Sequence, residues 1–146
     1  MDRWLGDGGM ALLRELGASL DAYGVDGEDL GWAEGDLAPT SLALNPAGGV
    51  QAGVHVTVLD AAMNFAINAA LASGERAEAT LEISTELVRG ARSGVRYRFR
   101  GEVVRLSRRV AFAEGTIRDP DGQVVSRASA TFLVRRADAP GRGSAS

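Results

Sequence analysis

The chain has 146 residues, of which 45% are hydrophobic, and its formal net charge is −3. This length supports one hydrophobic core, so residues 1–146 are expected to form a single domain. A sequence pI near 5.2 gives no electrostatic reason to bind nucleic acid. The lack of cysteine excludes disulfide bonds, a thiol nucleophile and a thiolate metal site.

The N-terminal region is predicted to be accessory to the core. Residues 1–16 carry acidic side chains and contain no long apolar segment, so they do not resemble a signal peptide, and we expect a cytoplasmic protein. Within residues 1–30, leucines at helical spacing predict an accessory helix from Ala11 to Tyr23 that ends at Gly24. A first strand is expected between Gly31 and Leu44, although a glycine and a proline interrupt it.

A loop, Asn45 to Gly49, is expected to lead the chain into a long helix, because it contains a proline and two glycines. That helix opens with the small residues Ala52 and Gly53. Their backbone N–H groups have no intrahelical acceptor and lie at the positive end of the helix dipole, so they can polarise a carbonyl oxygen. Asp60 follows two turns later and could face the other side of the same carbonyl.

The segment from Val50 to Ser73 has one charged residue, Asp60. It is long enough for about five turns of helix. Polar side chains at helical spacing share one face, and these are Thr57, Asp60, Asn64 and Asn68. The carboxylate is either satisfied by a neighbouring donor in the core or part of a functional site. A membrane span is disfavoured because these polar groups would lie in hydrocarbon, and a surrounding sheet explains the helix better.

Four further strands are expected after the helix. Ser73 to Glu75 has the composition of a turn. The predicted strands form an antiparallel meander, with a strong turn signal at Asp119–Gly122 between the last two. Their ranges are Ala79 to Leu87, Tyr97 to Leu106, Val110 to Arg118 and Val124 to Arg135. The tail, 137–146, is rich in Gly, Ser and Ala and is expected to be disordered.

The residues from Asn45 to Asp60 read N-P-x-G-x-x-Q-A-G-x-x-x-x-x-L-D. This pattern resembles the signature of hotdog-fold acyl-CoA thioesterases of the PaaI-like type, a group that covers phenylacetate-pathway and 4-hydroxybenzoyl-CoA thioesterases. The interval between the Asn and the acidic residue matches that family. Gln51-Ala52 stands where the family usually has His-Gly, which is the main departure. Thr80 matches the Thr or Ser that opens the strand after the helix, and the resemblance extends from Trp32 to Val134.

The resemblance implies an α+β hotdog fold, in which a curved antiparallel sheet wraps around one long central helix. It also implies a homodimer or a homotetramer built as a dimer of dimers, with active sites at the subunit boundary. By that resemblance, Asp60 of one chain would meet Thr80 of the other. No metal and no redox cofactor is implied, because coenzyme A is part of the substrate.

The implied activity is hydrolysis of an acyl- or aryl-CoA thioester. Ala52, with Gly53 as a second donor, would bind the thioester carbonyl through backbone N–H groups. Asp60 would act as a general base on water or as a nucleophile that forms a mixed anhydride. The supporting roles fall to Asn45, which would orient water or the loop, Gln51, which would contact the thioester, and Thr80, which would hold water beside Asp60.

All sixteen basic residues are arginine. Those between Arg89 and Arg109 are either a solvated face or a docking site for the phosphates of coenzyme A, which guanidinium groups bind in a bidentate manner. Arg89 and Arg92 are the first candidates for phosphate binding, and Arg108 and Arg109 are the second.

Two other functions remain open. A hotdog hydratase or dehydratase would need a histidine paired with an acid, but His55, the only histidine, lies roughly 140° around the helix from Asp60. His55 is therefore interpreted as a packing residue or a contact to a partner subunit. A non-catalytic acyl-thioester binding protein is the other alternative, because Gln-Ala replaces His-Gly.

Overall fold

A computed structural model describes residues 1–137, so the expected disordered tail lies outside the described residues except for its first residue. The elements in chain order are η1 (Asp2–Trp4), α1 (Ala11–Leu16), β1 (Ala18–Asp26), β2 (Leu30–Leu37), η2 (Ser41–Ala43), α2 (Ala52–Ala70), β3 (Arg76–Leu87), β4 (Tyr97–Leu106), β5 (Val110–Arg118) and β6 (Val124–Arg135). The six strands form one sheet in the order β1-β2-β4-β5-β6-β3.

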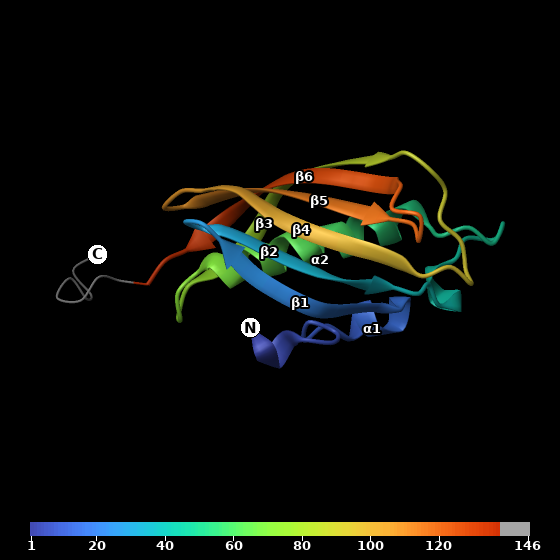
Figure 1. The fold of residues 1–146 in the computed structure, drawn as a ribbon, viewed down its shortest axis with the longest axis horizontal. Coiled ribbons are helices and arrows are strands. Elements are labelled where there is room, and N and C mark those ends of the chain that lie inside the picture. The colour runs from blue at the N-terminus through green and yellow to red at the C-terminus, as the bar shows by residue number, and fades with distance from the viewer. Residues whose placement is uncertain (138–146) are drawn as a thin grey trace.

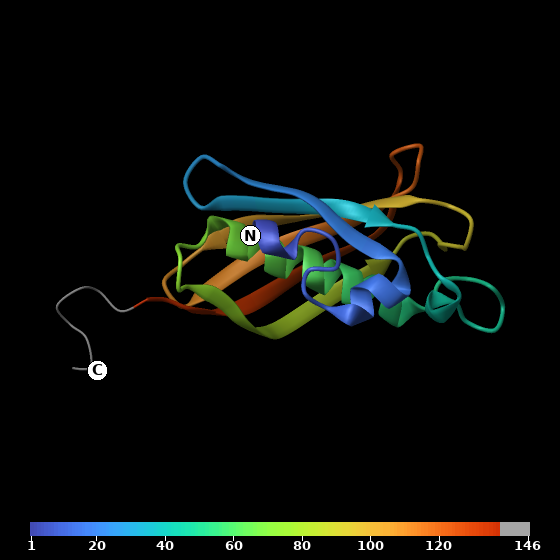
Figure 2. The same cartoon turned by 90° about the horizontal axis from the view of Figure 1, so that it is seen from below.

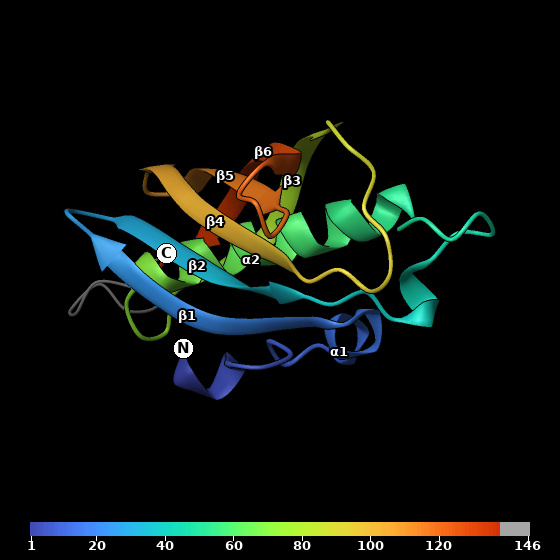
Figure 3. The same cartoon turned by 45° about the vertical axis from the view of Figure 1, so that its right-hand side comes forward.

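The sheet is antiparallel throughout and curls around α2, which lies along its concave face (Figures 1 and 3). This arrangement confirms the predicted α+β hotdog class. The predicted bounds of β4, β5 and β6 are confirmed, whereas β3 begins three residues earlier than predicted, at Arg76. No helix within residues 1–137 combines the length and apolarity needed to cross a membrane.

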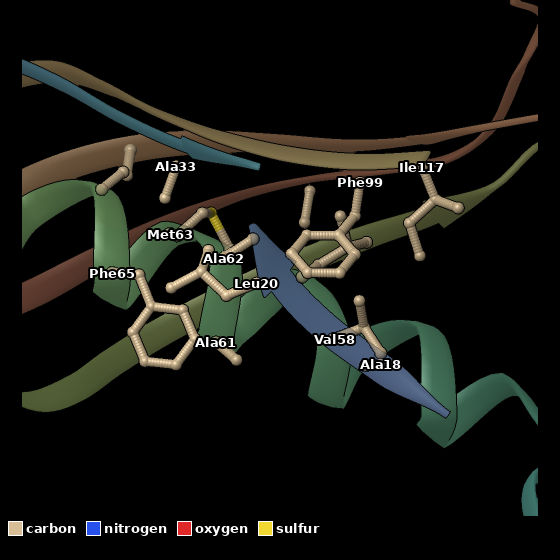
Figure 4. Packing of buried hydrophobic residues seen from close by; sticks show 14 of the residues in the cluster. Ala18, Leu20, Ala33, Val58, Ala61, Ala62, Met63, Phe65, Phe99 and Ile117 are labelled. Atoms are coloured by element: carbon tan, nitrogen blue, oxygen red, sulfur yellow. The ribbon is translucent and has the colours of Figure 1, made fainter. Parts of the chain in front are cut away.

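The helix α2 is held against the sheet by its apolar face. Val58, Leu59, Met63 and Ile67 are almost fully buried there, and Figure 4 shows Met63 and Val58 among core side chains of the sheet. The helix approaches the strands closely because β2 and β4 carry glycine, Gly31 and Gly101, where they pass it. A Cβ at Gly101 of β4 would lie 2.2 Å from the Ala62 carbonyl oxygen. The burial of this face supplies much of the driving force that positions α2.

The prediction of one helix from Ala11 to Tyr23 is wrong. The helix α1 ends at Leu16, and Gly17 adopts a left-handed conformation with φ of 92° while its N–H bonds to the last carbonyls of the helix. The chain then enters β1, where Leu20 is buried in alternation with exposed neighbours. Leu20 fits the helical period from Leu16 and also the strand period from Ala18, so the leucine spacing alone did not distinguish the two structures.

Two strands therefore precede α2 instead of the single strand expected between Gly31 and Leu44. They pair as a hairpin, β1 with β2, and only the second overlaps the predicted range. The rest of that range forms η2 and the loop into α2. Position 35 within β2 requires glycine, because a Cβ there would come within 2.6 Å of an atom of the Phe99 ring.

The N-terminal segment, residues 1–16, covers part of α2 on the side away from the sheet (Figure 2). Gly6 and Leu20 exchange two backbone hydrogen bonds, of 2.8 and 2.6 Å, which fasten the segment to β1. Gly8 packs directly on the Phe65 ring of α2, since a Cβ at Gly8 would lie 2.1 Å from a ring atom. The segment is therefore a fixed wall beside the central helix.

The edge strand β3 is open at the opposite side of the sheet. It pairs only with β6 among the described residues, so one of its edges carries unpaired backbone groups. Most of its side chains are exposed, including Leu81, which is 56% exposed, and Leu87, which is 48% exposed. Natural proteins rarely leave such an edge uncovered.

Candidate active site

A groove with a volume of about 760 Å³ lies between the N-terminal segment, α2 and β3. Its polar lining comes from the predicted polar face of α2 and from two residues of β3. These residues are Thr57, Asp60, Asn64 and Asn68 of α2 and Thr80 and Glu82 of β3. Its apolar lining includes Trp4, Met10, Leu12, Phe65, Leu81 and Ile83. The groove thus brings the single carboxylate of α2 next to an apolar surface large enough for a small ligand.

Asp60 and Thr80 form the polar centre of this groove. Thr80 Oγ1 donates a hydrogen bond of 2.6 Å to Asp60 Oδ1. Such a bond to a carboxylate is stronger than one between neutral groups and holds the side chain in one orientation. Asp60 is half-buried, so its carboxylate is not enclosed in the core but faces the groove.

The contact joins residues of the same chain, so the expectation that Asp60 meets Thr80 of a partner subunit is wrong. The reason lies in the connection between the two elements. From Asp60, α2 continues for about 15 Å to its end. After a short turn, β3 runs back along the helix for about 13 Å to Thr80, which returns that residue to the level of Asp60.

The other polar side chains on this face of α2 also make hydrogen bonds. Thr57 Oγ1 donates to the Gly53 carbonyl oxygen at 2.9 Å. Asn68 Oδ1 accepts from the Ala77 N–H at 2.8 Å, and Asn68 Nδ2 donates to Asn64 Oδ1 at 2.8 Å. These contacts anchor the start of β3 to α2.

The loop before α2 is organised by Asn45. Its side-chain Oδ1 accepts hydrogen bonds from the N–H groups of Ala47 (3.0 Å) and Gly49 (3.1 Å). Of the two roles predicted for this residue, the loop role matches these contacts. Asn45 therefore fixes the position at which the chain enters the helix.

The N-terminus of α2 presents free backbone donors. The Gln51 N–H donates to the Ala43 carbonyl oxygen at 2.9 Å, and the Gln51 side chain makes no capping hydrogen bond. Ala52 and Gly53 are exposed, and their N–H groups have no acceptor within residues 1–137. This end of the helix can bind an anion or a polarised carbonyl oxygen.

The two halves of the predicted site lie apart within one chain. Eight residues separate Ala52 from Asp60, which corresponds to about 12 Å along the helix axis. Asn45, Gln51, Ala52 and Gly53 are absent from the groove that contains Asp60 and Thr80. A single carbonyl group cannot contact both halves, because oxyanion donors must lie within about 3 Å of the oxygen.

The four candidate arginines also separate into two groups. Arg89 and Arg92 lie in the segment before β4, which joins the loop at the N-terminus of α2 through a hydrogen bond of 2.8 Å from the Val50 N–H to the Ala91 carbonyl oxygen. Arg108 and Arg109 lie at the β4–β5 hairpin, where the Arg109 carbonyl oxygen accepts from the Val134 N–H. That hairpin is at the other end of the sheet (Figure 1). Within residues 1–137, none of the four makes an ion pair.

His55 is a packing residue, as one of its two interpretations predicted. It is 2% exposed, and its Nδ1 lies 2.8 Å from the Ser126 hydroxyl oxygen of β6. Burial lowers the pKa of the His55 imidazole below its ordinary value of 6.5. The ring points into the core while Asp60 faces the groove, so the pair that a hydratase would need does not exist in this chain.

Comparison with known proteins identifies the family. Residues 48–126, more than half of the chain, match the sequence profile of the thioesterase superfamily. The chain belongs to this superfamily. It is therefore a thioester hydrolase, and the matched region contains Asp60, Thr80 and the N-terminus of α2. No curated protein matches the chain in sequence.

Solved structures agree with this assignment. A phenylacetic acid degradation-related protein of Ralstonia eutropha is 30% identical, and the alignment covers 84% of this chain and 89% of that one with a TM-score of 0.70. A thioesterase of Haemophilus influenzae has the same fold, with 22% identity, coverage of 89% and 86%, and a TM-score of 0.75. A Bacillus halodurans protein solved with coenzyme A is 27% identical, with coverage of 69% and 70% and a TM-score of 0.64.

The sequence predicted the polar face of α2 but not the apolar wall that the N-terminal segment adds to the groove. Trp4, Met10 and Leu12 line the groove from the N-terminal segment. Met10 and Leu12 are 41% and 51% exposed, and together with Trp4 they give the groove an apolar wall. Leu12 was assigned to the helix predicted from Ala11 to Tyr23, whereas Trp4 and Met10 lie before that helix and were not singled out.

Proposed function

We propose that this protein hydrolyses acyl-CoA thioesters with Asp60 as the catalytic carboxylate. The hydrogen bond from Thr80 to Asp60 carries this proposal, because it orients the one carboxylate of α2 toward a cavity of ligand size. Coenzyme A as the thiol component is supported by the Bacillus halodurans protein of the same fold, which was solved with that molecule.

The chemistry assigns one oxygen of Asp60 to positioning and the other to reaction. Oδ1 accepts the Thr80 hydrogen bond, and Oδ2 has no partner within residues 1–137. Acting as a base, Asp60 takes a proton from water while the water oxygen forms a bond to the thioester carbon. Acting as a nucleophile, Oδ2 itself attacks that carbon and forms a mixed anhydride, which water then hydrolyses to release the acid and restore the Asp60 carboxylate. In both routes the C–S bond breaks and the thiolate of coenzyme A leaves.

The donors for the developing oxyanion come from a second copy of the chain. The Ala52 and Gly53 N–H groups are about 12 Å along the helix from Asp60 of their own chain, too far to share its carbonyl. A homodimer that sets the α2 N-terminus of one protomer over the groove of the other completes the site. In that arrangement Gln51 contacts the thioester beside those donors, and Asn45 holds the loop.

The open edge of β3 suits a symmetric joint between two copies. Its unpaired backbone groups can pair with the same strand of a second chain, which removes an exposed edge and covers Leu81 and Leu87. The groove lies directly beside β3, so a joint there also places each groove at the subunit boundary. The assembly is a homodimer or a tetramer of two such dimers.

Arg89 and Arg92 are the proposed contacts for the coenzyme A phosphates. Both lie next to the loop that precedes the α2 N-terminus, on the same side as the donors that would hold the thioester carbonyl. Neither side chain is neutralised by an acid within residues 1–137, so both guanidinium groups can bind phosphate. Arg108 and Arg109 are second candidates because their hairpin lies at the far end of the sheet.

The test is release of free thiol from a panel of aryl-, arylacetyl- and medium-chain acyl-CoA thioesters. The proposal expects thiol release by the parent and almost none by Asp60→Asn. Saturable binding of the thioesters without thiol release would instead support the non-catalytic binding protein that the Gln51-Ala52 replacement left open. No binding and no release would contradict both.

A further inference from the structure

Asn64 offers a hydrogen-bond donor to the groove, and the direction of its amide is determined by its neighbours. The Ala77 N–H can donate only to an oxygen, so the Asn68 atom that lies 2.8 Å from it is Oδ1. Asn68 Nδ2 is then the donor to Asn64, which must accept with its own Oδ1 at 2.8 Å. Asn64 lines the groove, and its Nδ2 has no acceptor within residues 1–137.

This donor lies one helical turn beyond Asp60. Four residues separate the two side chains on the same face of α2, which corresponds to about 6 Å along the axis. The same groove has an apolar lining that includes Trp4, Leu12 and Phe65. The wall is fixed because Gly8 is packed on the Phe65 ring.

We propose that the groove selects acyl groups that carry a neutral hydrogen-bond acceptor, such as an ether, keto or hydroxyl oxygen, about one helical turn beyond the reacting carbonyl. Asn64 is the specificity residue, since its Nδ2 donates to that oxygen. This inference rests on the proposed function, because the thioester carbonyl must lie at Asp60.

The acyl group, not the coenzyme, occupies this part of the groove. No arginine is among the groove-lining residues in the described part of the chain, so the phosphates of coenzyme A find no cation there. An acyl carboxylate is disfavoured as well, because Asp60 and Glu82 both border the groove and would repel it. A neutral acceptor satisfies the donor without this cost.

Two thioesters of almost equal shape test the inference. Para-methoxybenzoyl-CoA and para-ethylbenzoyl-CoA differ chiefly in an ether oxygen that replaces a methylene group. The parent is expected to prefer the methoxy substrate in kcat/KM by roughly three- to tenfold, the usual weight of one neutral hydrogen bond. Equal values would overturn the inference and leave the proposed function standing.

Asn64→Asp is the sharpest variant. A carboxylate at this position still accepts from Asn68 Nδ2, so the anchor to β3 is kept, but it presents an acceptor to the ligand where Nδ2 was. The methoxy preference is expected to disappear or reverse. The ratio between the two substrates cancels any effect of the added charge on Asp60 chemistry. Asn64→Leu, checked for an unchanged circular dichroism spectrum, is expected to bring the ratio to about one. A retained preference in both variants would refute the role of Asn64.

Failure of the proposed function is separable from failure of this inference. If the parent hydrolyses neither thioester, the same two acyl groups are presented as non-hydrolysable thioether analogues of coenzyme A, and their binding is measured by calorimetry. Tighter binding of the methoxy analogue by the parent, lost in Asn64→Asp, would support the donor. Equal affinities, or no binding of either analogue, would overturn it.

Discussion

Replacement of Asp60 by asparagine isolates the charge of the carboxylate from its structural role. Asparagine has the same shape, and its Oδ1 can still accept the hydrogen bond that Thr80 donates over 2.6 Å. The fold should therefore lose less than about 1 kcal/mol of stability. The variant has neither a base nor a nucleophile of comparable strength, so turnover is expected to fall by at least about a hundredfold, which corresponds to roughly 2.7 kcal/mol in the barrier.

The assay is steady-state release of coenzyme A thiol, with thermal unfolding measured on the same samples. Thr80→Val serves as the matched control, because it removes the donor and keeps the carboxylate. Its expected loss is about ten- to a hundredfold in kcat/KM, the weight of one hydrogen bond to a charged group. An Asp60→Asn protein with an unchanged melting temperature and near-parent turnover would refute the catalytic assignment.

Four further outcomes are expected. Gln51→Ala should cost roughly 1–3 kcal/mol in kcat/KM, whereas Gln51→His should keep activity; an alanine variant equal to the parent would make Gln51 a loop residue only. Arg92→Gln should raise KM for an acyl-CoA but not for the same acyl group on N-acetylcysteamine, which lacks the phosphates. Arg108→Gln is the comparison variant, and its KM for the acyl-CoA should rise less. The pKa of buried His55 lies below its ordinary value of 6.5, so the unfolded chain binds a proton at this residue more strongly than the folded chain does. The free energy of unfolding, measured by chemical denaturation, should therefore be at its full value above pH 6.5 and should fall below that pH. The fall should be less steep in His55→Gln. Light scattering at micromolar concentration should give at least a dimer mass, and a monomer mass would contradict the shared site.

The parts of the fold that sequence periodicity predicts well are those with only one reading. The last three strands alternate buried and exposed residues and are bounded by clear turns, so their limits were predictable. The region from Ala11 to Asp26 fits two structures, because Leu20 follows the helical period from Leu16 and also the strand period from Ala18. The left-handed conformation of Gly17 ends the helix there, and whether a glycine adopts that conformation depends on contacts that form only in the folded chain.

The site was predictable as a set of residues but only in part as a geometry. The isolation of Asp60 in an apolar helix and the helical spacing of its polar neighbours identified the polar side chains of α2 that line the groove. The pairing with Thr80 depends on how β3 returns along α2, which the residue pattern does not show. The distance between Ala52 and Asp60, in contrast, follows from the predicted helix that contains both residues. The N-terminal wall was not predictable, because nothing local indicates that Gly8 packs on Phe65.

Subunit mixing tests whether each active site combines Ala52 of one chain with Asp60 of another, as proposed. Ala52→Pro deletes one oxyanion donor at the first helical position, where proline is tolerated. Each single variant, Ala52→Pro or Asp60→Asn, should be nearly inactive alone. In a mixed dimer one site carries both substitutions and the other carries neither.

The two variants are unfolded together, refolded as an equal mixture and assayed for thiol release. Random pairing makes about half of the dimers mixed, each with one intact site, so the account predicts about a quarter of the parent activity. Refolding each variant alone provides the baseline. If the mixture shows no more activity than that baseline while the parent refolds to full activity, the site is not shared between chains and the account is contradicted.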